Sequence, residues 1–427
     1  MSAVAATLPP ADMDGVDFAL DDQPDLHAVM AALRRNRDYA IVRFAGTRAV
    51  LLLTQELVAA GFRDEERFPS SAAYSLTTAP VWGRTIQCMT GREHRVNRAI
   101  VSTPLRRSHV GRYIAPIIEP VVNDLIDRFA NRGVADLVPE FTQRFSLLIN
   151  NRMLGIPIED EKTVYRWAQG LLHYAIEPDE AKRCANELTE YVLPIVAARR
   201  RNPGDDMISR LATETTDDGD RLDDEQILSF IRLLYPVGAD TTMLAMGNVL
   251  AALLTHPAEL ELVRSDPDEH IHHAIWEALR WEAPVGTLPR VCPKATRWQG
   301  IDIPAMTPIV FAINAANRDP SVYPDPDTFD VTRRATPLVA FGQGPHSCIG
   351  NWLAFAELTT AMRLLLERLP NLRLAEGAEV RVTSQVVPTL RGPNTLPVTF
   401  DRCSPTSAQT IHCATIAAAT SRRPDTT

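Results

Sequence analysis

The most informative stretch of this sequence is Phe341-Gly342-Gln343-Gly344-Pro345-His346-Ser347-Cys348-Ile349-Gly350. It joins a β-type run, Leu338–Phe341, to a helical pattern over Ile349–Leu369. Two glycines followed by proline predict a tight loop whose backbone lies close to whatever it packs on. Cys348 falls at the start of the predicted helix, where free N–H groups and the helix dipole favour a thiolate. A thiolate binds metals, so Cys348 is a candidate ligand.

Two other interpretations of this loop are a buried structural cysteine and a zinc site that uses His346 and Cys348. The zinc site lacks a matching second pair of ligands in the sequence. The loop closely resembles the haem-binding signature of cytochrome P-450 enzymes, F-G-x-G-x-H-x-C-x-G, and matches every fixed position. The resemblance implies that Cys348 binds the haem iron. Phe341 and Gly342 would then line the cofactor site, and Gly350 would leave room for the flat macrocycle.

Composition places the chain among soluble globular proteins, because 45% of its 427 residues are apolar and 23% are charged. A formal net charge of −9 argues against nucleic acid or an anionic membrane as partner. The six cysteines are scattered, as in a reducing compartment. No signal-like segment opens the chain, and the apolar stretch Ile231–Leu254 is interrupted by Arg232, Pro236 and Asp240. We therefore expect a cytoplasmic protein with no membrane contact.

Periodicity predicts a fold that is mainly α with small β-sheets, and the resemblance implies a single large domain enclosing a haem. A long helix over Asp223–Leu254 should be distorted at Pro236 and Gly238. We expect an N-terminal segment at 1–37, the haem domain at 38–400 and a disordered tail at 401–427. The other predicted elements are strands at Tyr39–Val42, Ala49–Leu53, Ile309–Ala312, Val380–Thr383 and Pro397–Phe400, helices across Arg92–Leu262 with breaks at Gly155–Pro157 and Asn202–Asp206, and a helix at Asp268–Trp281.

Glu277 and Arg280 stand at i, i+3 on one predicted helix face. Alone they would be read as an exposed ion pair worth a few tenths of a kcal/mol. Cytochrome P-450 chains carry a similar E-x-x-R before the cysteine loop, where the pair is buried and joined by a second arginine. Arg333 is the candidate for that arginine, with Arg318 and Arg334 as nearby alternatives.

Asp240 and Thr241 lie inside the long apolar helix, where polar groups are costly without partners. A threonine bonded back to the preceding turn would explain the hydroxyl without any function. The segment is also similar to the family's A-G-x-D/E-T motif, which implies that both residues are catalytic, Thr241 holding water or hydroperoxide and Asp240 relaying protons. Val237 departs from the usual Ala of that motif.

His94 and Arg98 lie at i, i+4, a spacing that most often marks a solvated basic face. The spacing is similar to the family's H-x-x-x-R, which binds haem propionates. Arg290 and His346 match the family's other propionate contacts. The implied cofactor is haem b, iron protoporphyrin IX.

The resemblance implies a monooxygenase that inserts one atom of O2 into a hydrophobic small molecule, by hydroxylation or epoxidation, with electrons from a separate ferredoxin and its reductase. The alternatives are a hydrogen-peroxide-dependent peroxygenase and a non-catalytic haem-binding sensor. A basic patch that includes Arg106 and Arg107 is the candidate docking surface for ferredoxin. Phe355, where the family commonly has Arg, could alter that surface. The substrate pocket should draw on Tyr74–Ile86, Trp167–Leu193, Val285–Leu288 and Val386–Thr389.

Overall fold

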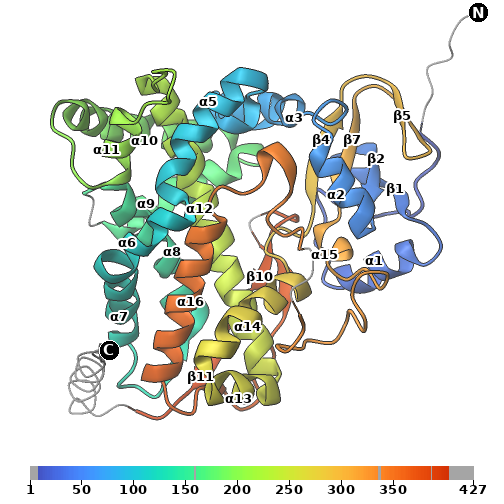
Figure 1. The fold of residues 1–427 in the computed structure, drawn as a ribbon. Helices are drawn as coiled ribbons and strands as arrows, with labels where there is room; N and C mark the ends of the chain where they lie inside the picture. Colours follow the sequence, from blue (N-terminus) through green and yellow to red (C-terminus); the bar gives the residue numbers. More distant parts are fainter. Residues whose placement is uncertain (1–7, 158–159, 335–337, 386, 403–427) are drawn as a thin grey trace, which may run out of the picture.

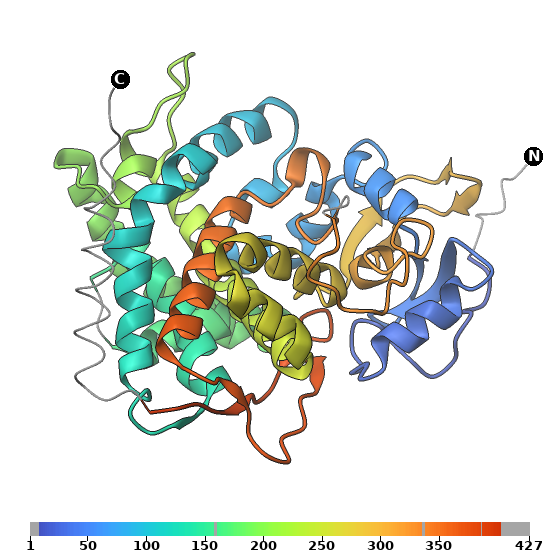
Figure 2. The ribbon, with the colours of Figure 1, turned by 60° about the horizontal axis from the view of Figure 1, so that its bottom comes forward.

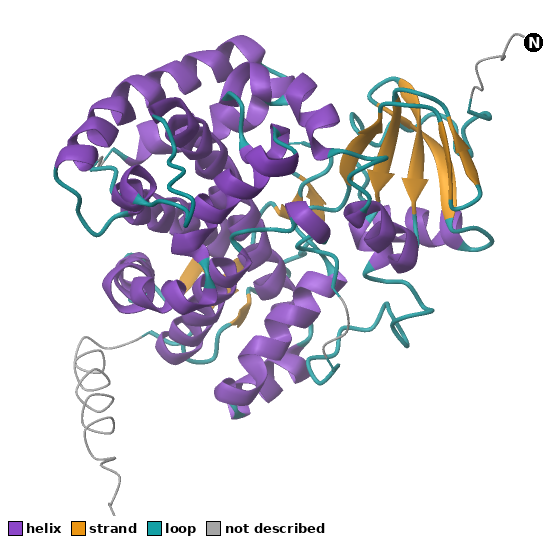
Figure 3. Cartoon of the chain, turned by 45° about the horizontal axis from the view of Figure 1, so that its top comes forward, coloured by secondary structure: helices purple, strands orange, loops and turns teal. Residues whose placement is uncertain are grey.

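The computed structural model describes residues 8–402 apart from 158–159, 335–337 and 386. Most helices gather in one part of the molecule, and the largest sheet stands beside them (Figures 1 and 3). The predicted class, mainly α with small β-sheets, is confirmed. The α-helices are α1 Leu26–Arg34, α2 Gln55–Arg63, α3 Ser70–Thr77, α4 Ala79–Trp82, α5 Gly91–Ser102, α6 Arg107–Tyr113, α7 Glu119–Asp127, α8 Gln143–Leu154, α9 Glu161–Leu172, α10 Pro178–Arg201, α11 Met207–Thr213, α12 Asp224–Thr255, α13 Pro257–Ser265, α14 Pro267–Trp281, α15 Ile313–Ala316 and α16 Asn351–Arg368.

The described residues form four small sheets, with the strand orders β1-β2-β7-β4, β3-β11-β8, β9-β10 and β5-β6. The strands are β1 Tyr39–Phe44, β2 Thr47–Leu52, β3 Val134–Asp136, β4 Leu288–Cys292, β5 Thr296–Trp298, β6 Ile301–Ile303, β7 Thr307–Phe311, β8 Arg373–Leu374, β9 Val382–Ser384, β10 Arg391–Pro393 and β11 Pro397–Thr399. Short 3-10 turns cover Ile86–Cys88, Thr103–Leu105, His173–Ala175 and Gly344–His346, and π-helical turns cover Ile114–Ile118 and Val138–Thr142.

The largest sheet is buried on both faces, which explains its rich content of β-branched and aliphatic residues. Alternate residues face opposite sides, so Val50 and Phe311 join one apolar cluster while Leu51 and Val310 join another. β2 runs parallel to β7, and β4 runs antiparallel to β7. This pairing brings β4, and with it Arg290, into the interior next to the helices.

Helix α12 crosses the middle of the helical part (Figure 1), and the Asp223 side chain caps it together with Gln226. Pro236 lies inside the helix without interrupting it, and side chains of α8 donate hydrogen bonds to carbonyl groups near it. Asn150 Nδ2 donates to Leu234 O at 3.1 Å. Among the described residues, only α12 is long and apolar enough to cross a membrane, and 78% of its most apolar window is buried inside the protein, as in a core helix.

The segment before the cysteine loop differs from its prediction. Leu338–Phe341 forms no strand: the Val339 N–H donates to the Asn317 side chain at 3.1 Å and so has no strand partner. Helix α16 begins at Asn351 rather than Ile349, and it packs against α14 (Figure 2). Cys348 therefore precedes the helix instead of starting it. The predicted tail at 401–427 lies, from residue 403 on, outside the described residues.

Candidate active site

The cysteine loop is closed by its own backbone. The Cys348 N–H donates to Phe341 O at 2.8 Å, and the Ser347 N–H donates to Gly344 O at 3.1 Å. Gly344 has a φ of +72°, and a Cβ there would lie 2.9 Å from Phe62 O at the end of α2. Only glycine allows both this conformation and this close approach, so the predicted tight loop is present and is anchored on α2.

Cys348 is an exposed residue, although many protein atoms lie around its thiol. Burial raises the pKa of its thiol, while the N–H groups of Gly350 and Asn351 and the Arg98 guanidinium act to lower it. The backbone N–H donors expected beside the sulfur are thus present. In the protein without a bound cofactor, burial outweighs them and favours the protonated thiol. Phe341 packs on Phe355, with 5.7 Å between ring centroids, on the side of the loop that faces α16.

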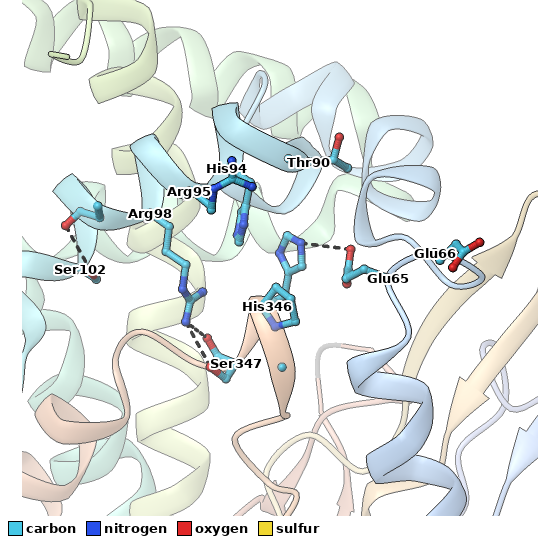
Figure 4. Close-up of a pocket in the computed structure, with 13 residues that line it drawn as sticks. Glu65, Glu66, Thr90, His94, Arg95, Arg98, Ser102, His346 and Ser347 are labelled. Carbon is cyan, nitrogen blue, oxygen red and sulfur yellow. Dashed lines mark hydrogen bonds and ion pairs between the residues drawn. The ribbon is translucent and has the colours of Figure 1, made fainter. Parts of the chain in front are cut away.

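A cavity of about 740 Å³ opens next to the loop, between α5 and the segment that carries His346 (Figure 4). His94 and His346 both line it, and their rings lie in contact with centroids 4.1 Å apart. Arg98 reaches from α5 to donate to Ser347 O at 2.6 Å, and His346 Nε2 lies 3.3 Å from Glu65 Oε2. Three of the four residues expected to hold propionates therefore meet at one opening.

The fourth, Arg290, is buried on β4, where its guanidinium lies 5.6 Å from the centroid of the Tyr74 ring. Within the described part of the chain, neither Arg290 Nη1 nor His94 Nε2 has a hydrogen-bond partner, although both atoms are buried. Burial, His346 and Arg98 lower the pKa of His94 to about 4, so its ring is neutral at pH 7. Buried polar atoms without partners are unusual, and a ligand carrying carboxylates would accept hydrogen bonds from Arg290 Nη1 and from the His94 tautomer with its proton on Nε2.

One face of α12 is accessible although the rest of the helix is deeply buried. Val237, Gly238 and Thr241 are half-buried, while Asp240 is only 3% exposed. The Thr241 hydroxyl donates to Val237 O at 2.7 Å, which is the back-bonded arrangement that the sequence left open. Its oxygen can still accept a hydrogen bond.

Asp240 has a partner that the sequence did not predict. Asp240 Oδ1 accepts a hydrogen bond from Gln169 Nε2 on α9 at 2.8 Å. Burial raises the pKa of Asp240 to about 7, and the Gln169 hydrogen bond opposes this rise. Nothing local in the sequence marks Gln169, because the two residues are 71 positions apart.

Glu277 lies at the centre of a buried ion-pair cluster. Arg280 binds its two oxygens through Nε and Nη2, each at 2.7 Å, and Arg333 Nε lies 3.1 Å from Oε1. Arg318 instead binds Asp327 and Trp281 O. Of Arg318, Arg333 and Arg334, Arg333 is the residue that forms an ion pair with Glu277.

An apolar cluster forms where three of the segments expected around the substrate converge on α12. Its members come from the end of α9, from α12 and from the turns at 285 and 387–390. They are Leu172, Met243, Leu244, Leu390, Val285 and Val387. Val386 lies outside the described residues.

Together these residues fit a flat cofactor that has a metal at its centre and carboxylates at its edge. The thiol of Cys348 is accessible, and a Cβ on Gly350 would meet only Cys348 Sγ, at 3.9 Å. The buried donors on His94 and Arg290 lack partners among the described residues. A protein interior would ordinarily fill such space and pair such donors.

Comparisons with known proteins agree with this fit. The family model for cytochrome P450 matches residues 15–379. Cytochrome P450 107B1 of Saccharopolyspora erythraea is 33% identical over 81% of this chain and 82% of its own. The 6-deoxyerythronolide B hydroxylase of the same organism is 30% identical over 88% of this chain and 96% of its own. The crystal structure of P450BioI in complex with hexadec-9Z-enoic acid ligated acyl carrier protein has a TM-score of 0.79 at 28% identity, over 88% of this chain and 99% of that one. The chain belongs to the cytochrome P450 family of haem-dependent monooxygenases, which act on small molecules with O2.

Proposed function

We propose that this enzyme hydroxylates or epoxidises a hydrophobic small molecule, using haem b, O2 and electrons from a separate ferredoxin and its reductase. The observation that carries the proposal is the accessible Cys348 thiol inside the helical part of the protein, with hydrogen-bond donors on the backbone beside it. A sulfur so placed can bind iron from one side and is kept in position by the closed loop. We infer a cytoplasmic location.

Cys348 would bind the haem iron through its sulfur, and Phe341, Gly342 and Gly350 would shape the surface that receives the cofactor. When bound, the haem supplies the oxygen-activating chemistry. His94, Arg98, Arg290 and His346 would hold its carboxylates at the cavity between α5 and the cysteine loop. The unpartnered donors of His94 and Arg290 support this role. The ion pairs of Glu277 with Arg280 and Arg333 would stabilise the structure around the cysteine loop, because they join α14 to the segment that precedes this loop.

Asp240 and Thr241 are the proposed catalytic residues on α12. Asp240, with a pKa of about 7, can both carry and release a proton at neutral pH. Thr241 donates its own hydrogen to Val237 O, which leaves the hydroxyl oxygen to accept a hydrogen bond from water in the pocket. The pair would move protons from the buried carboxyl group of Asp240 to the pocket. An enzyme that uses O2 needs this delivery of protons, whereas a peroxygenase does not, because hydrogen peroxide already carries them.

The substrate class is inferred from the apolar cluster of Leu172, Met243, Leu244 and Leu390, which lies where the segments expected around the substrate meet α12. A hydrophobic molecule is the substrate that such a surface favours. The relative named as a hydroxylase of 6-deoxyerythronolide B supports hydroxylation as the reaction type.

The decisive experiment compares two oxidant systems on one substrate. A library of hydrophobic compounds is first screened for those that change the spin state of the haem iron, which shifts the haem absorption band. Each compound that does so is then incubated with the enzyme in two ways, either with ferredoxin, reductase and NADPH or with hydrogen peroxide. We expect product from the ferredoxin system. Product from peroxide alone would identify a peroxygenase, and binding without product in either system would indicate a sensor.

A further inference from the structure

The buried carboxyl of Asp240 is held by a neutral side chain. Gln169 Nε2 donates to Oδ1 at 2.8 Å, and Oδ2 has no partner among the described residues. Buried carboxylates are ordinarily paired with a cation or with several donors, because an isolated charge is costly in the interior. A single amide donor is a weak anchor for the ionised form, and so the contact leaves both protonation states accessible.

The surroundings of Asp240 contain few charges. No lysine or arginine of the described chain lowers its pKa. From α9, Tyr165 is the titratable group that interacts with it electrostatically, since Asp240 raises the pKa of Tyr165. From α8, the neutral side chains Ser146 and Asn150 bind carbonyl groups of α12. The hydrogen bond from Gln169 therefore orients the carboxyl group and favours its ionised form.

Gln169 also joins the buried Asp240 to a helix face that reaches the protein surface. It is half-buried on α9, four residues after Tyr165, whose side chain is 41% exposed. Residues four apart share one face of a helix, so the face of α9 that carries Gln169 leads outward to the surface at Tyr165. Gln169 is thus the half-buried polar side chain between the exposed Tyr165 and the buried carboxyl of Asp240.

We propose that Gln169 positions Asp240 for proton transfer, and that each proton which Asp240 passes to the pocket is replaced from bulk water along the face of α9 formed by Tyr165 and Gln169. This inference rests on the proposed proton-relay role of Asp240. Gln169 is a positioning residue: the proton moves from water to the carboxylate oxygen and then onward, while the amide keeps its own hydrogens.

The test is an infrared titration of the protonated carboxyl in the holoenzyme, with Asp240→Asn to identify its band. In Gln169→Leu the lost hydrogen bond no longer favours the ionised form, so the titration midpoint rises by about one pH unit. In Gln169→Lys the new cation favours the ionised form and the midpoint falls. Lys162→Leu, an exposed change on the same helix, is the control and leaves the midpoint in place. An unchanged midpoint in both Gln169 variants would overturn the inference.

A second measurement separates this inference from the function on which it rests. The fraction of consumed O2 that appears in product, and its solvent deuterium isotope effect, are measured for each variant with the ferredoxin system. We expect Gln169→Leu to lower that fraction several-fold and to enlarge the isotope effect, as Asp240→Asn does more strongly. If Asp240→Asn itself changes neither quantity, the relay role of Asp240 fails. If Asp240→Asn changes both but the two Gln169 variants match the wild type, only the role of Gln169 fails.

Discussion

Arg333 Nε lies 3.1 Å from Glu277 Oε1, at the centre of a cluster in which the Glu277 side chain is only 3% exposed. The same oxygen accepts the Asp330 N–H at 3.1 Å, so one carboxylate joins α14 to the segment that precedes the cysteine loop. A buried charge with this many partners is costly to disturb, because removing it leaves two guanidinium groups without their counter-ion.

Replacing Glu277 by Gln should therefore destabilise the protein by about 3–5 kcal/mol. The measurement is the free energy of unfolding from a urea titration. Asp268→Asn is the matched control, because it removes an exposed ion pair with Arg363 and should cost less than about 1 kcal/mol. Equal effects of the two changes would show that the Glu277 cluster does not brace the fold.

The sequence predicted those parts of the site whose residues lie close together along the chain. The glycines and Cys348 form one loop, and their spacing alone specifies a tight turn. His94 with Arg98, and Glu277 with Arg280, share helix faces at fixed intervals, which places each pair on one side of its helix. These local relationships survive folding because helix and turn geometry hardly varies.

The rest depends on contacts between distant segments. Gln169 approaches Asp240 only because α9 packs on α12, which no local pattern encodes. Leu338–Phe341 has the composition of a strand, yet the Asn317 side chain takes the bond that a neighbouring strand would make. Pro236 lies within α12 without ending it, and side chains from α8 bind carbonyl groups around it. In the first two cases contacts between distant segments decided the outcome.

Cys348→Ala should abolish the red-shifted carbon monoxide spectrum that thiolate ligation produces in this family. The physical reason is the loss of the sulfur whose electron density reaches the metal. Cys292→Ala is the control, because Cys292 is also a free cysteine but is buried at the end of β4. The reduced carbon monoxide difference spectrum is recorded for both. A Cys348→Ala protein that kept the red-shifted band would require another axial ligand.

The proposed docking surface predicts a change in electron transfer that depends on salt. Arg106 and Arg107 are exposed at the start of α6, and Arg107 lies over the Trp352 ring at 5.1 Å. Reversing both charges should slow reduction by an acidic ferredoxin about tenfold or more at low ionic strength and flatten its salt dependence. Stopped-flow reduction at several salt concentrations measures this.

The control for that experiment reverses two charges elsewhere. Arg201 and Arg221 are exposed at the end of α10 and just before α12, and their double change to Glu alters the net charge of the protein equally. We expect it to leave the reduction rate near the wild-type value. Equal slowing by both pairs would mean that overall charge, rather than a patch at Arg106 and Arg107, attracts the donor.

A second buried network predicts how stability depends on pH. Glu282 binds Arg391 Nε at 3.0 Å and Asn314 Nδ2 at 2.7 Å, and its other oxygen lies 2.7 Å from His27 Nε2. Although burial raises the pKa of Glu282, the charges of His27, Arg391 and Arg318 outweigh it and hold that pKa at about 2. Burial also lowers the pKa of His27.

Because the pKa of Glu282 is lower in the folded than in the unfolded protein, its contribution is present above about pH 4.5 and disappears as the pH falls towards 2. The size is about 3 kcal/mol. The lowered pKa of His27 acts in the same direction below pH 6.5. Urea titrations measure the free energy of unfolding at each pH. Between pH 4.5 and 2 the Glu282→Gln protein should lose about 3 kcal/mol less of this free energy than the wild type. Glu379→Gln, an exposed change, should keep the wild-type slope.

Arg290→Leu should weaken retention of the haem while leaving the polypeptide fold largely intact. Arg290 Nη1 is buried without a partner among the described residues, and a carboxylate of the bound cofactor would supply the missing hydrogen bond. A charge-assisted hydrogen bond contributes about 1.5–3 kcal/mol, which corresponds to haem loss about 10 to 100 times faster. Transfer of haem to an acceptor globin measures this rate. Arg297→Leu is the control, since Arg297 is exposed in a loose ion pair with Asp302. Unchanged haem loss in Arg290→Leu would remove Arg290 from the cofactor site and leave its burial beside Tyr74 as a packing contact.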